Sequence, residues 1–283
     1  MGMKLKPILT VLHPFNSLGS GVGAIIGYLI TAWHYQQPVD LRALLMTGAA
    51  TTLIAAGGFV VNDIMDIEID RVNRPDRPLP AGAISVATAW ALYWVLNTTA
   101  LALALKVSGI LALVAVGIVM LLFIYSTQLK QRFLVGHVAI GIMGALILPF
   151  GALALGHALP VMLSVLFVFP AFFAREVLKT VPDYVGDKAH GVDNLATRYG
   201  PRAALRISKV SLLCTALMLP LILPVWSLNR WYIIAAVVGI WPILLYALLR
   251  STPQNSRTLI AISKLLFLLT AGALLVGSAP GLG

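Results

Sequence analysis

Long apolar stretches separated by short polar segments run along the whole chain. Each is about 20 residues long, the length that an α-helix needs to cross about 30 Å of hydrocarbon. The stretches are continuous rather than alternating and are rich in Ala, Leu and Gly, which favours helices over the strands of a membrane β-barrel. The pattern predicts nine transmembrane helices with cores at residues 14–33, 42–62, 86–105, 108–128, 136–156, 159–178, 203–224, 231–250 and 258–279.

Composition supports the same class of protein. Hydrophobic residues make up 59% of the 283 residues and charged residues only 11%, too few to cover the surface of a soluble domain. We therefore predict an all-α integral membrane protein in which residues 1–283 form a single domain.

The net charge of +10 raises the question of a nucleic-acid partner, which the positions of the charges answer. With nine helices, 17 of the 20 Lys and Arg residues fall on the side of the amino terminus, and only Arg42, Lys106 and Arg230 fall on the other. This asymmetry is typical of membrane topology. It predicts a multi-pass protein of the cell membrane with a cytoplasmic amino terminus and no nucleic-acid partner.

Acidic residues are rare, and seven of the ten gather in two clusters. Each cluster follows a predicted helix, one at the end of 42–62 and the other at the end of 159–178. Both contain an Asp-x-x-x-Asp step, which places two carboxylates on one face if the helix continues that far. The acids are Asp63, Asp66, Glu68 and Asp70 in the first cluster, and Glu176, Asp183 and Asp187 in the second.

Carboxylates at a membrane boundary attract divalent cations, and the first cluster adds the amide oxygen of Asn62. Such hard oxygen ligands suit Mg²⁺, which commonly holds a phosphorylated substrate against a protein. Two half-sites in matching positions therefore predict a clamp for a diphosphate. The alternative is that these acids are solvated or balance neighbours such as Arg71 and Lys188.

A diphosphate also needs positive side chains, and the same side of the membrane offers Lys130, Arg132, Arg175, Lys179 and Lys188. Arg175, Glu176 and Lys179 lie within or at the end of an apolar stretch, where charge is costly, which favours a role in the site. Arg132 and Lys188 have an equal alternative as ordinary topogenic charges.

Two further polar residues have open interpretations. Tyr125 closes the predicted helix 108–128 and belongs either to the site or to an aromatic belt at the membrane surface. Asn16 lies in the first turns of the predicted helix 14–33, either as a helix-end residue or as a polar contact in a cavity.

The sequence Asn62-Asp63-x-x-Asp66-x-x-x-Asp70, with a second acidic motif after the sixth predicted helix, resembles the UbiA-type intramembrane prenyltransferases over nearly the whole chain. Tyr125 and Lys130 match a recurrent element of that family. The resemblance implies a nine-helix bundle around a central cavity, Mg²⁺ between the two motifs, a polyprenyl diphosphate donor and a lipophilic acceptor among the membrane lipids.

On this resemblance, the side chains of the site take distinct roles. Catalysis is expected of Asp66, Asp183, Lys130 and Tyr125. Metal ligation is expected of Asn62, Asp66, Asp183 and Asp187, with Asp63 and Asp70 as ligands or their partners. Substrate contacts are expected of Asn16, Arg74, Arg77, Lys130, Arg132, Arg175, Lys179 and Lys188.

Residues 73–82 and the step Arg175-Glu176-x-x-Lys179 are most similar to the family branch that adds a second geranylgeranyl chain to a glycerol phosphate ether lipid precursor. Thr180 departs from this branch, which generally has Asp there, as do His13 in place of Arg and His137 in place of Asn. An aromatic acceptor is the alternative within the family. A cation transporter is the alternative from another class, and it predicts acids near the bilayer midplane.

Overall fold

The computed structural model describes residues 5–222 and 228–280, and this part of the chain is helical without any strand. The helices are α1 Leu5–Val11, α2 Pro14–His34, α3 Leu41–Met65, α4 Ile67–Asn73, α5 Val86–Val107, α6 Gly109–Ile124, α7 Val135–Ala145, α8 Ile147–Leu153, α9 Leu159–Met162, α10 Ser164–Lys179, α11 Tyr184–Ala189, α12 Leu195–Tyr199, α13 Pro201–Met218, α14 Arg230–Ile234, α15 Trp241–Arg250 and α16 Ser256–Ser278. Helical turns at Tyr125–Leu129, Leu219–Ile222 and Ala235–Ile240 extend α6, extend α13 and join α14 to α15.

The all-α membrane class is confirmed, whereas the count of nine spanning helices is not reproduced. Within the described ranges, seven helices are long and apolar enough to cross a membrane. The two other predicted segments differ for physical reasons. Residues 159–178 are divided at Leu163 into the short α9 and the 16-residue α10. Residues 203–224 correspond to the 18-residue α13, which carries several cations, and residues 223 and 224 lie outside the described part.

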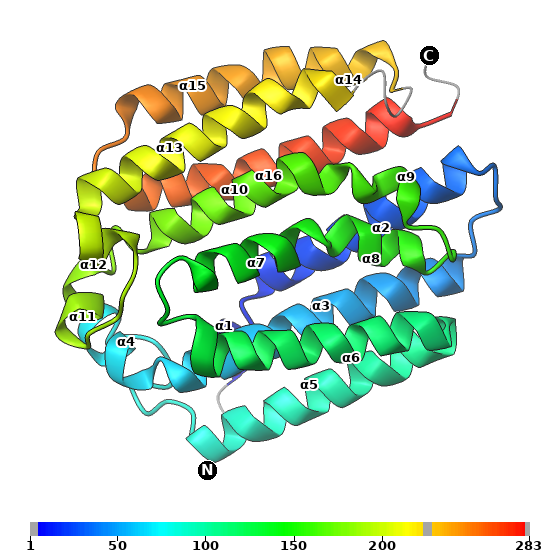
Figure 1. Cartoon of the computed structure of the whole chain (residues 1–283). Helices are drawn as coiled ribbons and strands as arrows, with labels where there is room; N and C mark the ends of the chain where they lie inside the picture. The colour runs from blue at the N-terminus through cyan, green and yellow to red at the C-terminus, as the bar shows by residue number, and fades with distance from the viewer. Residues whose placement is uncertain (1–4, 223–227, 281–283) are drawn as a thin grey trace.

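The helices lie side by side (Figure 1). The contacts among six segments close an inner ring. Around this ring, α2 packs on α3, α3 on α6, the turn after α6 on α7, α7 on α10, α10 on α16, and α16 again on α2. Helices α5 and α13 pack outside the ring, against α3 and α10 respectively. This arrangement gives the molecule an interior lined by six segments.

Glycines bring α2 and α8 into direct backbone contact across this interior. A Cβ atom added to Gly151 would lie 1.8 Å from the carbonyl oxygen of Ala24, and one added to Gly27 would lie 2.1 Å from that of Leu148. Neither position has space for a side chain. Close approach at this crossing therefore depends on glycine at both positions.

Replacing Gly151 with alanine is expected to destabilise the bundle by about 1–3 kcal/mol, the usual cost of overpacking a tight contact. The measurement is the midpoint of thermal unfolding of the purified protein in detergent, followed by tryptophan fluorescence. Gly117 in α6 is the matched control, because nothing lies within 4 Å of a Cβ added there. Gly117→Ala should leave the midpoint unchanged or slightly higher, and equal midpoints for the two variants would contradict the prediction.

Short helices gather at one end of the bundle, where α4, α11 and α12 lie together (Figure 1). They occupy the two long polar segments, residues 63–85 and 179–202, that follow α3 and α10. Asp66 precedes α4 with φ −93° and ψ 2°, and Asp183 precedes α11 with φ −91° and ψ 0°. The amide of Asp70 bonds to the carbonyl of Asp66, and that of Asp187 to the carbonyl of Asp183. Both Asp-x-x-x-Asp steps thus form one turn of similar helical geometry, as their spacing predicts.

Candidate active site

A polar chamber of about 650 Å³ lies at this end of the bundle. Its walls come from both acidic segments and from the ends of α2, α3, α7, α10 and α16 that lie nearest to these segments. Seven carboxylates and seven Lys or Arg side chains line it, so the formal charges of these side chains balance. Such a concentration of paired charge inside a membrane bundle marks a functional site.

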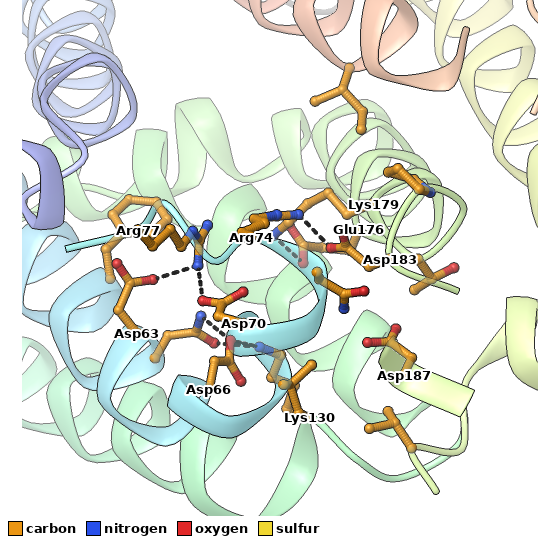
Figure 2. A pocket seen from close by; sticks show the side chains of 18 of the residues that line it. Asp63, Asp66, Asp70, Arg74, Arg77, Lys130, Glu176, Lys179, Asp183 and Asp187 are labelled. Carbon is orange, nitrogen blue, oxygen red and sulfur yellow. Dashed lines mark hydrogen bonds and ion pairs between the residues drawn. The ribbon is translucent and has the colours of Figure 1, made fainter. Parts of the chain in front are cut away.

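The first motif is held by a lysine from the turn after α6. Lys130 Nζ forms an ion pair with Asp66 and donates a hydrogen bond of 3.1 Å to Asn62 Oδ1. Asn62 Nδ2 in turn donates to Asp66 Oδ2 at 2.8 Å. Figure 2 shows the side chain of Lys130 pointing toward Asp66. Lys130 thus forms one hydrogen-bonded group with two residues of a distant segment, Asn62 and Asp66.

Arg77 holds the remaining two carboxylates of this motif. Its guanidinium donates to Asp63 Oδ1 at 3.0 Å and to Asp70 Oδ2 at 2.5 Å (Figure 2). His13 Nε2 lies 2.9 Å from the other oxygen of Asp63. Burial raises the pKa of Asp70 and outweighs the opposing effect of the arginine. Asp63 and Asp70 are therefore largely occupied by protein partners.

The second motif faces the first and is less fully paired. Asp183 forms an ion pair with Arg74, yet its Oδ1 atom is buried without a hydrogen-bond partner. Asp187 accepts a bond of 2.8 Å from Asn194 Nδ2. Burial, together with the nearby negative charge of Asp183, raises the pKa of Asp187 to about 6. Unsatisfied carboxylate oxygen of this kind favours the arrival of a cation.

The side chain of Asn73, next to the first motif, bonds to the backbone of the second motif. Its Oδ1 atom accepts a hydrogen bond of 3.0 Å from the amide of Gly186, and a Cβ added to that glycine would lie 2.3 Å from the same oxygen. The contact holds α4 against α11, so the two acidic helices keep a fixed relation.

Helix α10 adds charges to the wall opposite the first motif. Lys179 Nζ lies 2.9 Å from both oxygens of the buried Glu176. Arg175 lies 3.6 Å from the same carboxylate and donates to Asn16 Oδ1 at 3.4 Å. Tyr125 is buried at the start of a π-helical turn, a distortion that is frequent at functional sites. Asn16 and Tyr125 are both cavity residues by this geometry.

The donor set fits Mg²⁺. In the parts of the chain that the structure describes, no three His, Cys, Asp or Glu residues converge closely enough to enclose a metal ion. Mg²⁺ does not require such a cage, because it commonly keeps several waters and binds one or two carboxylates together with substrate phosphates. The unpartnered Asp183 oxygen and the amide oxygen of Asn62 provide ligands of the right chemistry on the two sides of the chamber.

Most of the predicted site residues line this chamber, whereas two do not. Arg132 is exposed outside it, and Lys188 donates to the hydroxyl of its neighbour Tyr184 at 3.1 Å on the surface. The lining residues are Asn16, Asn62, Asp63, Asp66, Asp70, Arg74, Arg77, Tyr125, Lys130, Arg175, Lys179, Asp183 and Asp187. The structure thus places Arg132 and Lys188 as surface charges, in line with their topogenic interpretation.

Several chamber residues were not among the predicted contacts. They are His13, Asn73, His137, Asn194, Arg257 and Lys264. Lys264 could have been predicted as a site residue, because a lysine inside an apolar stretch is costly and commonly functional. Asn73 and Asn194 carried none, since their contacts depend on how two distant loops meet.

An all-helical membrane bundle whose acidic and basic side chains face each other in one internal chamber defines a protein that handles an anionic substrate inside the membrane. The chain belongs to the UbiA prenyltransferase family, whose model matches residues 22–277. It is therefore a multi-pass membrane protein and a polyprenyl transferase.

Relatives within the family give a consistent picture. The chain is 30% identical to digeranylgeranylglyceryl phosphate synthase of Saccharolobus solfataricus over 98% of its own length and 99% of that protein. It is 34% identical to the enzyme of that name from Methanoregula boonei, over 88% and 87% of the two chains.

Solved structures share the fold. A structure of digeranylgeranylglyceryl phosphate synthase has a TM-score of 0.72 and 27% identity, over 97% of this chain and 98% of that one. A UbiA homologue from Aeropyrum pernix K1 has a TM-score of 0.80 at 20% identity, over 92% and 97%. A UbiA homologue from Archaeoglobus fulgidus, solved with GPP and Mg²⁺, has a TM-score of 0.61 at 20% identity, over 95% and 99%.

Proposed function

We propose that this protein transfers a geranylgeranyl group from its diphosphate to geranylgeranylglyceryl phosphate in a Mg²⁺-dependent reaction of ether-lipid synthesis. The observation that carries the proposal is the meeting of two acidic motifs across one polar chamber that continues into apolar pockets. A diphosphate with a long apolar tail matches this combination. The names of the relatives support the glycerol phosphate acceptor over an aromatic one.

Mg²⁺ would be held by Asn62 and Asp66 on one side and by Asp183 and Asp187 on the other, with Asp63 and Asp70 supporting them through Arg77. When bound, it would neutralise the diphosphate and favour its departure. The single transmembrane domain predicted from the sequence is consistent with one such site in the chain.

The chain's own cations complete the leaving-group site. Lys130 and Arg74 now pair with Asp66 and Asp183, and each can turn to a diphosphate oxygen once that carboxylate has another partner. Lys179 adds positive charge from α10. These groups stabilise the negative charge that develops as the allylic carbon–oxygen bond breaks.

The allylic carbocation formed by this cleavage needs protection from water. Apolar and aromatic residues adjoin the polar chamber, among them Phe59, Tyr125 and Phe172. Their rings exclude water and stabilise positive charge through their π faces. The acceptor hydroxyl then forms the new carbon–oxygen bond and gives up its proton to a base in the chamber.

The excess of Lys and Arg on the side of the two motifs supports a cytoplasmic site in the cell membrane, with lipid substrates drawn from the bilayer and no nucleic-acid partner. The acids lie at helix ends on one side of the bundle rather than at its middle, which disfavours the alternative of a cation transporter.

Product formation by the purified protein in detergent tests the proposal. Geranylgeranyl diphosphate is supplied with either Mg²⁺ or EDTA, and the acceptors are geranylgeranylglyceryl phosphate, 4-hydroxybenzoate and homogentisate. We expect product with the glycerol phosphate lipid in Mg²⁺ and none in EDTA. Product only with an aromatic acceptor would overturn the proposed acceptor, and the same yield in EDTA would overturn the role of the metal.

A further inference from the structure

Two of the unpredicted cations lie on one face of α16 that also carries apolar residues. Arg257, Ile260 and Lys264 line the polar chamber at helical spacing. Further along the helix, Phe267 and Ala271 line an apolar pocket that Lys264 also borders. A single helix face thus passes from cationic to apolar at Lys264. That order matches the order of groups in a lipid with an anionic head.

These two cations differ from those of the acidic motifs because they have no carboxylate partner. No ion pair joins Arg257 or Lys264 to an acid within the described ranges, whereas Lys130, Arg74 and Arg77 each bind an aspartate. Lys264 Nζ lies 5.5 Å from the centre of the Phe15 ring. An ammonium group in an apolar helix is costly without an anion, so this side of the chamber is prepared for a negative ligand.

Two apolar pockets of about 160 Å³ each adjoin the chamber. The first, lined mainly by α3, α6, α7 and α10, has Asn62, Tyr125 and Lys179 at its polar end. The second, between α2, α10 and α16, has Asn16 and Lys264 at its polar end. Phe59, Phe172 and Arg175 border both pockets. One pocket therefore adjoins the acidic motif, while the other adjoins the unpaired cations.

We propose that Arg175, Arg257 and Lys264 form a second anion site that binds the phosphate of the acceptor lipid without metal, with the acceptor chain in the adjoining pocket of α2 and α16. The inference rests on the proposed function, since it assigns one apolar pocket to each prenyl chain. The donor chain takes the pocket beside Asn62, because its diphosphate needs the acidic motifs. Arg175 lies between the two chains and can contact either head group.

Charge explains why the two head groups separate in this way. A phosphate monoester carries about two negative charges near pH 7, and Arg257 and Lys264, which have no acidic partner in the described structure, can pair with it directly. The acidic side would repel it unless metal were present. The donor diphosphate would therefore bind at the acidic motifs with a divalent cation, and the acceptor phosphate would bind at the cations of α16 without one.

Kinetics of Lys264→Gln test this assignment. The KM for geranylgeranylglyceryl phosphate is expected to rise about tenfold or more, the usual effect of losing a charge-assisted hydrogen bond, while the KM for geranylgeranyl diphosphate and the Mg²⁺ requirement stay within about twofold. Lys264→Arg should keep most of the acceptor affinity, because it retains the charge. Arg257→Gln should shift the same KM in the same direction.

The exposed Arg206 of α13 provides the matched control, since it is a cation that lines none of the three cavities. Arg206→Gln should leave both KM values unchanged. An increase of the donor KM in Lys264→Gln, or no change in either KM, would overturn the inference.

Binding without turnover separates this inference from the proposed function. Geranylgeranylglyceryl phosphate should bind the wild type in EDTA, and Lys264→Gln should bind it about tenfold more weakly. If the wild type forms product with this acceptor but binds it only when Mg²⁺ is present, the second site is wrong while the function stands. If the wild type uses only aromatic acceptors and does not bind the lipid, the proposed function fails, and the inference fails with it.

Discussion

Replacing Asp66 with asparagine is expected to lower kcat/KM for prenyl transfer by about 1,000-fold, the effect of losing a main electrostatic contact to a developing charge. The side chain is buried in the chamber wall and pairs with Lys130. Asparagine has nearly the same size, so the shape of the site is preserved while one negative charge is lost. The measurement is initial rate at saturating Mg²⁺ with both lipid substrates.

Glu68 provides a control in the same segment. It is exposed on α4, forms its ion pair with the exposed Arg71, and does not line the chamber. Glu68→Gln removes an equal charge and should keep the rate within about twofold, because exposed ion pairs contribute little. A similar loss in both variants would mean that net charge of the segment, rather than Asp66 itself, supports the reaction.

Replacing Asp183 with asparagine is expected to lower kcat/KM by about 100-fold and to raise the Mg²⁺ concentration needed for half-maximal rate. The carboxylate faces the first motif with one buried oxygen that lacks a protein partner, the atom best suited to a bound cation. Its loss also leaves Arg74 without a negative partner. Initial rates measured over a Mg²⁺ titration check both effects.

Asp193 is the corresponding control in the second polar segment. It is exposed and pairs with Arg198 outside the chamber. Asp193→Asn should leave the Mg²⁺ titration curve unchanged. If Asp183→Asn has the same curve as the wild type, the second motif takes no part in binding the metal.

The sequence predicts the acidic motifs and seven of the nine expected spanning helices, because both depend on local pattern. A long apolar run indicates a helix in lipid, and two aspartates four residues apart indicate that both lie on one face of a helix. The similar backbone geometry at Asp66 and Asp183 confirms the second of these inferences. The break at Leu163 was not predictable in the same way, since the apolar pattern continues across it.

The partners of the acidic residues depend on tertiary structure and could not be predicted. Lys130 and Arg132 are two residues apart, yet only Lys130 enters the chamber. The π-helical turn Tyr125–Leu129 ends just before Lys130, and the chain then turns over residues 130–134. Helical periodicity therefore gives no guide to which of the two cations points inward.

Lys264 illustrates a different limit. Its position within an apolar stretch marks it as unusual, but a charge count by side of the membrane treats it like any other lysine. The role that we propose for it rests on the absence of a carboxylate partner in the described structure and on the pocket beside it. The sequence shows that Lys264 is a cation in an apolar stretch, but only the folded structure indicates which of the two substrates it would bind.

The measurement that tests the shared metal site most directly is Mn²⁺ binding, followed by electron paramagnetic resonance with inorganic diphosphate present, with Mn²⁺ standing in for Mg²⁺. We expect the wild type to bind Mn²⁺ tightly only together with diphosphate, and Asp66→Asn and Asp183→Asn each to weaken this binding. If either variant bound Mn²⁺ and diphosphate as tightly as the wild type, the two motifs would not form one metal site.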